Sequence, residues 1–228
     1  MNEQTLRENI ARAQERIAAA ERRASRVGEV TLIAVSKTHP AEAVAAAFHG
    51  GLTRFGENRV EEAGPKAEAL RDLPLEWHMI GHLQSRKAGD VFPWASLVHS
   101  VDSIKLAGRL SRAAAGGQTL RVLLQVNVSG ETSKEGFAPE ELPGAVGIVA
   151  ALPGLRIDGL MTMAPIARDP EEVRPVFRAL RGLRDDLARQ FPKIAWRHLS
   201  MGMTDDFEVA IEEGATLVRI GRAIFGER

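Results

Sequence analysis

A lysine follows the first apolar run of the sequence. Lys37 comes directly after Val30–Ser36, so a strand over this run would deliver its amine to the end of a buried sheet, where an unpaired ammonium is costly. Desolvation favours the neutral amine, which is the form that condenses with an aldehyde to give a Schiff base. The structural alternative is a lysine whose stem packs on the rim while its ammonium reaches water. Lys37 is therefore the first candidate for covalent chemistry.

Two glycine-containing loops near the C-terminus could bind a phosphate. The second begins at Gly221, ahead of a short helical piece at Arg222–Phe225. Backbone N–H groups at a helix start and glycines that allow close approach are suited to an anion, although single glycines are equally typical of turns. The first loop combines two hydroxyl side chains with a glycine, in the order Ser200, Met201, Gly202, Met203 and Thr204.

Arg219 precedes the second loop and could face the same site. A guanidinium is a permanent cation and a donor, so opposite a pyridine nitrogen it would keep that nitrogen unprotonated and the ring a poor electron sink. The alternative is an arginine paired with a carboxylate such as Glu57 or Glu213.

These residues can act together only in a fold that places the ends of several strands close to one another. Short apolar runs alternate with helical patterns from Val30 onward, which is typical of βα units around a parallel sheet. The eight runs predict strands over Val30–Ser36, Thr53–Gly56, Glu76–Ile80, Ser96–Val101, Leu120–Val128, Ile157–Met161, Trp196–Ser200 and Thr216–Ile220. The helical patterns are clearest at Ala41–His49, Val60–Leu70, Ile104–Ala115, Pro139–Ala151, Pro170–Gln190 and Phe207–Glu213. An amphipathic helix comes before them, with Leu6, Ile10, Ala13, Ile17 and Ala20 on one face.

This order predicts an α/β fold, a single (β/α)8 TIM barrel with an additional N-terminal helix, as one domain over residues 1–228. Sites in such barrels lie at the carboxyl ends of the strands, with phosphate in the loops after strands seven and eight. Because strand eight closes on strand one, Lys37 would lie beside those loops, and an aldehyde carrying a phosphate would fit between them. Asn58 would belong to the same polar rim. An open doubly wound sheet is the alternative, but no glycine-rich fingerprint follows the first strand.

Composition narrows the functional classes. Hydrophobic residues make up 44% and charged residues 26% of the 228 residues, as in ordinary globular proteins. Lys plus Arg and Asp plus Glu are 30 each, a balance that argues against a nucleic-acid or anionic-membrane partner. There is no cysteine, no signal-peptide pattern and no apolar run of about 18 residues. A cytoplasmic monomer is the expectation.

The motifs taken together resemble the alanine racemase N-terminal-like barrels that hold pyridoxal 5′-phosphate (PLP), and more closely the pyridoxal phosphate homeostasis protein family. The resemblance spans nearly the whole chain and is specific as a set. It is carried by Ile33–Lys37, Phe55–Asn58, Trp77–Gln84, Gly159–Met163, Leu199–Phe207 and Val218–Gly221. The family commonly has serine at Thr204, a change that keeps the hydroxyl.

The resemblance implies a PLP-binding protein of intracellular PLP homeostasis without a catalytic residue set or a metal. By it, Lys37 would carry PLP as a Schiff base and Arg219 would face the pyridine nitrogen. Asn58 would line the ring. The phosphate would be bound by Ser200, Met201, Gly202, Met203, Thr204 and Gly221. PLP-dependent apoenzymes that receive the cofactor are the expected protein partners.

A PLP-dependent amino-acid racemase is the alternative function. Racemases of the related barrel use a tyrosine from a separate β-domain as the second base, and this sequence contains no tyrosine and stops soon after the eighth predicted strand. His82 is the candidate replacement, although it can equally be a histidine that is satisfied by its neighbours.

A histidine pair and a second lysine leave alternatives open. His78 and His82 could serve a metal-dependent hydrolase, but their spacing converges on a helix, whereas Trp77–Ile80 is predicted as a strand. Lys134 is a second amine near the barrel mouth, either a surface charge or a transient contact for departing cofactor.

Overall fold

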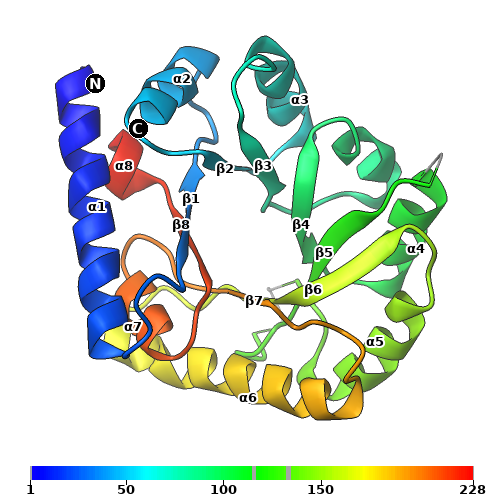
Figure 1. The fold of residues 1–228 in the computed structure, drawn as a ribbon. Helices are drawn as coiled ribbons and strands as arrows, with labels where there is room; N and C mark the ends of the chain where they lie inside the picture. The colour runs from blue at the N-terminus through cyan, green and yellow to red at the C-terminus, as the bar shows by residue number, and fades with distance from the viewer. Residues whose placement is uncertain (1, 115–116, 132–134, 228) are drawn as a thin grey trace.

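The computed structural model describes residues 2–114, 117–131 and 135–227. Eight parallel strands close into a barrel in chain order, with β8 pairing β1, as predicted (Figure 1). The strands are β1 (Thr31–Val35), β2 (Arg54–Glu57), β3 (Glu76–Met79), β4 (Ala95–Val101), β5 (Leu120–Gln125), β6 (Leu155–Met161), β7 (His198–Ser200) and β8 (Leu217–Ile220). No helix of the described residues is both long enough and apolar enough to cross a bilayer.

Helices surround the strands as an outer layer (Figure 1). They are α1 (Glu3–Arg23), α2 (Ala41–His49), α3 (Val60–Ala69), α4 (Ile104–Ala113), α5 (Leu142–Ala150), α6 (Arg174–Gln190), α7 (Phe207–Glu212) and α8 (Arg222–Phe225). Short 3-10 helices are η1 (Ser85–Val91), η2 (Pro139–Glu141) and η3 (Pro170–Val173).

Several element boundaries differ from the sequence predictions. The connection from β3 to β4 is the 3-10 helix η1, which the periodicity did not indicate. Strand β7 begins at His198 instead of Trp196, because Trp196 has φ of +41° and cannot continue a strand. Strand β5 ends at Gln125, and the next residue, Val126, forms an isolated bridge with Phe137. Ala115, the predicted end of the fourth helix, lies outside the described residues.

The N-terminal helix covers the seam where the barrel closes. Figure 1 shows α1 running along α8 and α7, outside β1 and β8. Its buried stripe is the predicted one, and Asn2 caps its start by accepting the Thr5 N–H at 2.7 Å. Because α8 has only four residues, α1 supplies the apolar cover that a longer last helix would give.

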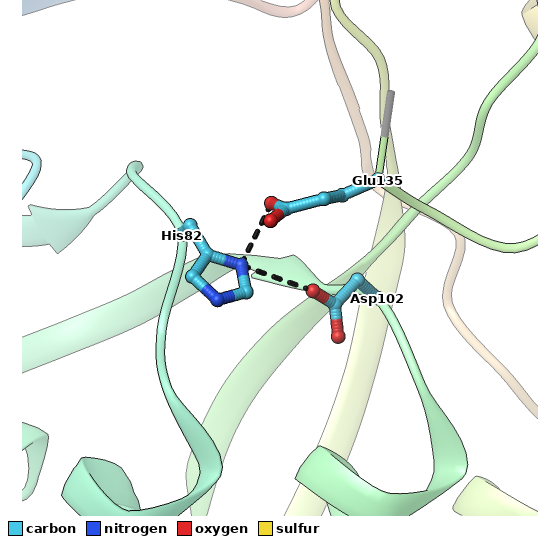
Figure 2. A group of neighbouring side chains, drawn as sticks. All are labelled: His82, Asp102 and Glu135. Atoms are coloured by element: carbon cyan, nitrogen blue, oxygen red, sulfur yellow. Dashed lines mark ion pairs between the residues drawn. The ribbon is translucent and has the colours of Figure 1, made fainter. Parts of the chain in front are cut away.

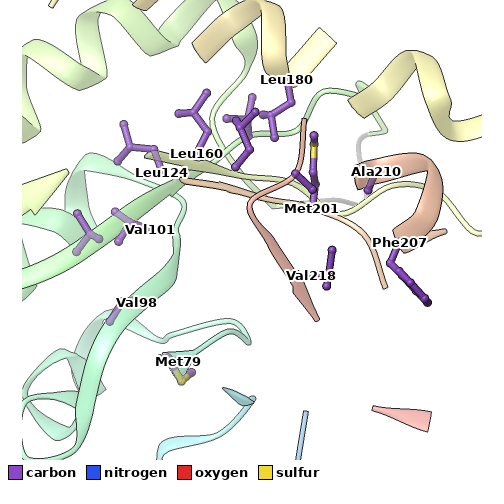
Figure 3. Packing of buried hydrophobic residues seen from close by; sticks show 14 of the residues in the cluster. Met79, Val98, Val101, Leu124, Leu160, Leu180, Met201, Phe207, Ala210 and Val218 are labelled. Atoms are coloured by element: carbon purple, nitrogen blue, oxygen red, sulfur yellow. The ribbon is translucent and has the colours of Figure 1, made fainter. Parts of the chain in front are cut away.

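The apolar core has two parts, separated by the alternation of side chains along each strand. The larger part packs the outer face of the strands against the helices (Figure 3). The smaller part uses the alternate positions and therefore lies inside the barrel, where it comprises Ile33, Leu97, Leu123, Met161 and Leu217. Five apolar side chains leave much of the interior to polar groups.

Candidate functional site

A cavity of about 730 Å³ opens at the carboxyl ends of the strands, where the fold places sites. It includes the ends of β1 and β8, which are neighbours in the sheet. Apolar side chains such as Val35, Ile80 and Met163 form part of the wall. Six of the nine predicted site residues line it, namely Lys37, Asn58, Met203, Thr204, Arg219 and Gly221.

The other three predicted residues lie beneath the cavity wall. Ser200 and Met201 are fully buried, at 0% exposure. Gly202 turns the chain with φ of +93°, and a Cβ there would lie 2.6 Å from the Ala210 Cβ, so a side chain does not fit. Its carbonyl accepts the Arg219 backbone N–H at 3.0 Å. This turn presents Met203 and Thr204 to the cavity while Ser200 stays below.

Lys37 is held at the rim by a strained turn. The side chain of Lys37 is half-buried, and the next residue, Thr38, has φ of +66°. A left-handed conformation costs a β-branched residue about 1–3 kcal/mol, so neighbouring contacts must hold it. Glu62 does so by accepting the Thr38 N–H at 2.9 Å.

A buried polar cluster fixes the strand end behind Lys37. Glu57 is fully buried and accepts the Ser36 hydroxyl and the Lys66 ammonium, each at 2.7 Å. Lys66 also donates to the Ser36 carbonyl at 2.9 Å. Burial raises the pKa of Glu57, against the opposing effect of Lys66 and Ser36. The cluster joins the ends of β1 and β2 to α3.

Arg219 lines the cavity while lying almost wholly within the barrel, at 5% exposure. Its guanidinium donates to Ser200 Oγ at 2.6 Å and to the Thr162 carbonyl at 3.0 Å. Desolvation lowers its pKa to about 10, which leaves it charged at neutral pH.

The predicted alternative partners of Arg219 were wrong. Glu57 is bonded to Lys66 and Ser36. Glu213 is paired with arginines on α6, including Arg178 at 2.8 Å. Neither carboxylate therefore neutralises the charge of Arg219 at the cavity.

His82 stands at the cavity rim between two carboxylates. Its Nδ1 lies 2.7 Å from a Glu135 oxygen and 3.3 Å from an Asp102 oxygen (Figure 2). These atoms are close enough together to hold a cation, although His82 and Glu135 are both exposed and already paired. Because carboxylates only accept, the His82 Nδ1 that faces them is a protonated ring nitrogen.

His78 does not join His82, contrary to what a two-histidine metal site would need. His78 is buried, and its Nδ1 lies 2.9 Å from His99 Nε2. His99 Nδ1 in turn lies 2.8 Å from Ser200 Oγ. Sequence reasoning missed His99 and its contact with Ser200. The available signal was a polar residue at an inward position of a strand, between Val98 and Ser100.

Lys134 lies outside the described residues.

The arrangement combines an amine, a buried guanidinium and two hydroxyl- and glycine-bearing loops around one cavity. The loops after β7 and β8 are tied together by Arg222, which forms two 2.6 Å bonds to the Asp205 carboxylate. Such a set can condense an amine with a carbonyl compound and hold an anionic group beside it.

The fold and this set of residues define a class of protein, the barrels of the alanine racemase N-terminal domain, whose family model matches residues 2–228. Curated relatives extend over almost the same length. The pyridoxal phosphate homeostasis protein of Aquifex aeolicus (strain VF5) is 47% identical over 224 residues, covering 97% of each chain. That of Pseudomonas aeruginosa is 48% identical over 226 residues, covering 98% of this chain and 96% of its own. The chain belongs to the pyridoxal phosphate homeostasis protein family.

A solved structure agrees with this assignment. PipY of Synechococcus elongatus PCC7942, solved with PLP bound, has 37% sequence identity and a TM-score of 0.85. The match covers 97% of this chain and all of PipY.

Proposed function

We propose that this protein binds PLP and serves intracellular PLP homeostasis by holding the cofactor and supplying it to PLP-dependent apoenzymes. The observation that carries the proposal is the placement of Lys37 and Arg219 in one cavity together with Thr204 and Gly221. Its volume, about 730 Å³, suits a small-molecule site, since such sites span roughly 300–1,000 Å³. The relative PipY binds PLP in a closely similar fold.

The residues around the cavity fit each part of PLP. The aldehyde would condense with the Lys37 amine, forming a C=N bond with loss of water. Arg219 would face the pyridine nitrogen, and as a donor it would favour the unprotonated ring. Asn58 would line the ring.

The two loops would bind the phosphate. Met203, Thr204 and Gly221 reach the cavity surface, so the Thr204 hydroxyl and the backbone would make the direct contacts. Ser200, Met201 and Gly202 would shape the loop from below, and Ser200 would act through Arg219, to which it is bonded.

The absence of tyrosine from the sequence supports a carrier over a racemase. His82 is a candidate second base through Nε2, since its Nδ1 is engaged by Glu135 and Asp102. We propose that the protein has no complete racemase catalytic set and requires no metal. An assay of the PLP-loaded protein with alanine tests this, because conversion between its enantiomers would favour the racemase.

We further propose that residues 1–228 act as one domain, as a monomer in the cytoplasm. The equal numbers of basic and acidic residues, 30 each, support action without a nucleic-acid or membrane partner. Light scattering of the purified protein tests the monomer, and a dimer mass would contradict it.

Borohydride trapping tests the central claim. Incubation with PLP, reduction and peptide mapping should give one stoichiometric adduct at Lys37 in the native protein and none in Lys37→Ala. The free energy of unfolding should change by less than about 0.5 kcal/mol, because truncating a rim lysine removes no core packing. Lys105→Ala, at an exposed position of α4, is the matched control and should label normally. An unlabelled native protein, or a stoichiometric adduct that persists in Lys37→Ala, would overturn the proposal.

A further inference from the structure

A line of buried polar side chains crosses the barrel interior from Arg219 to the opposite end. Arg219 donates to Ser200 Oγ at 2.6 Å, and Ser200 Oγ lies 2.8 Å from His99 Nδ1. His99 Nε2 lies 2.9 Å from His78 Nδ1, and His78 Nε2 lies 3.3 Å from a Glu76 carboxylate oxygen. The first four residues are at most 5% exposed. The line therefore joins four strands, β8, β7, β4 and β3.

The carboxylate end sets the direction of the hydrogen bonds along the line, and the guanidinium end is compatible with that direction. A guanidinium only donates, so Ser200 Oγ accepts from Arg219 and can direct its own proton to His99. An ionised carboxylate only accepts, so the His78 nitrogen beside Glu76 must carry the proton. That contact is electrostatic and poorly aligned as a hydrogen bond, but a bare ring nitrogen there would face the carboxylate with a lone pair.

With the proton of His78 fixed on Nε2 by Glu76, the two imidazoles have one consistent arrangement. Each carries its proton on Nε2 and accepts on Nδ1. His78 then accepts from His99, and His99 accepts from Ser200.

The electrostatics agree with this arrangement. Desolvation lowers the pKa of both His78 and His99, which keeps the two rings neutral near pH 7. The pKa of Glu76 is lowered to about 2, first by its contact with His78, so it remains ionised. Neutral rings with defined tautomers are what a directional chain requires.

We propose that His99 is a positioning residue, whose Nε2–H tautomer, set by His78 and Glu76, holds the Ser200 hydroxyl and thereby aims the Arg219 guanidinium into the cofactor cavity. The line of side chains supplies one of the two hydrogen-bond acceptors of Arg219, the Ser200 hydroxyl, and the other is the Thr162 carbonyl. Among the described residues Arg219 forms no ion pair, so its orientation depends on these neutral acceptors. The effect on cofactor binding rests on the proposed function, whereas the tautomers do not.

Nitrogen NMR of the histidine rings in the cofactor-free protein tests the tautomers directly. His78 and His99 should both show a protonated Nε2 and an unprotonated Nδ1 at pH 7, with assignments from His78→Gln and His99→Asn. A charged His99, or His99 protonated on Nδ1 in the native protein, would overturn the proposal.

Substitution of His99 tests the coupling to the cofactor. His99→Leu removes the acceptor for Ser200 and should weaken PLP binding about tenfold, the worth of one hydrogen bond, and shift the absorbance of bound PLP. His99→Asn places an amide oxygen near the former Nδ1 and should stay within about twofold of the native affinity. A His99→Leu protein that is folded and binds PLP like the native protein would refute the positioning role.

A substitution of Glu76, at the other end of this line of side chains, is the sharpest test. Glu76→Gln can present either a donor or an acceptor to His78, so the tautomer of His99 should become mixed and the bound-PLP spectrum should change. Glu68→Gln, which breaks an exposed ion pair with Arg71, is the control and should change neither. An unaltered His99 tautomer in Glu76→Gln would contradict the chain, even if His99→Leu did not fold.

The outcomes separate this inference from the proposed function. If the native protein has the predicted tautomers but gives no Lys37 adduct, the proposed function fails and the positioning role fails with it. The line of buried polar side chains would then remain only as a structural feature. If the native protein labels at Lys37 and neither His99→Leu nor Glu76→Gln changes the bound PLP, only the inference fails.

Discussion

The Arg219 guanidinium shows how a residue's surroundings decide its role. A buried arginine is usually paired with a carboxylate, which would cancel its charge. Here its acceptors are the Ser200 hydroxyl and the Thr162 carbonyl, so the charge remains available to a bound ring. Desolvation lowers the pKa of Arg219, and the charge of Asp206 opposes this effect without offsetting it.

This placement predicts the effect of removing the charge. Arg219→Gln should weaken PLP binding about tenfold and change the visible absorbance of bound PLP with pH, because a neutral amide no longer disfavours a protonated ring nitrogen. Absorbance titration of the loaded protein measures this. Arg219→Lys keeps the charge and is the control. An absorbance that is the same across pH in Arg219→Gln and the native protein would count against Arg219 as the ring's partner.

At the scale of elements, β6 and β7 approach each other at a glycine. Gly159, inside β6, has φ of +152° and pairs with His198. A Cβ built there would lie 1.9 Å from the His198 carbonyl oxygen, closer than any two such atoms can come. Only glycine permits this register of the two strands.

Gly159→Ala should therefore destabilise the protein by about 3 kcal/mol or more, since strand β6 or β7 must move. Urea unfolding measures the loss. Gly147→Ala is the matched control, because Gly147 is exposed in α5 with nothing within 4 Å of a new Cβ. It should stabilise the protein by about 0.5–1 kcal/mol, from helix propensity. Equal stabilities of Gly159→Ala and the native protein would contradict the close approach of β6 and β7 at Gly159.

At the scale of the whole molecule, the polar interior makes stability depend on pH. Burial lowers the pKa of His78, His99 and His198, that of His198 to about 4. An imidazole in the unfolded chain titrates near 6.5, so below that pH the unfolded state binds more protons than the folded state. The stability that neutral histidines confer is complete above pH 6.5 and is lost as the pH falls toward 4.

His198 allows this to be measured at one position. Its Nε2 lies 3.0 Å from Arg121 Nη2, and a neutral ring accepts that bond. His198→Gln keeps an acceptor without titrating, so it should reduce the stability lost between pH 7.5 and 5 by about 1 kcal/mol, after allowance for solvent screening. Urea unfolding at both pH values gives the difference. His49→Gln, in the last turn of α2, is the control. The same pH slope in His198→Gln and the native protein would contradict the assignment.

Periodicity and the residue types after each strand were enough to predict the barrel and the candidate residues at its rim. Strand and helix periods are local properties, and a closed parallel barrel puts all carboxyl strand ends on one face. Lys37, Asn58, Thr204, Arg219 and Gly221 could therefore be expected at one cavity before any coordinates, and the cavity lining agrees.

The contacts among the polar groups could not be predicted without the closed fold. The partners of Arg219, the burial of Ser200 below the cavity and the His99 contact depend on which inward positions meet across the barrel. Ser200 and His99 are 101 residues apart, on β7 and β4, and meet because strand register and side-chain alternation bring them to the same level of the interior. No local pattern contains that register. The sequence therefore identified the residues at the mouth, while the closed fold determined what holds them in place.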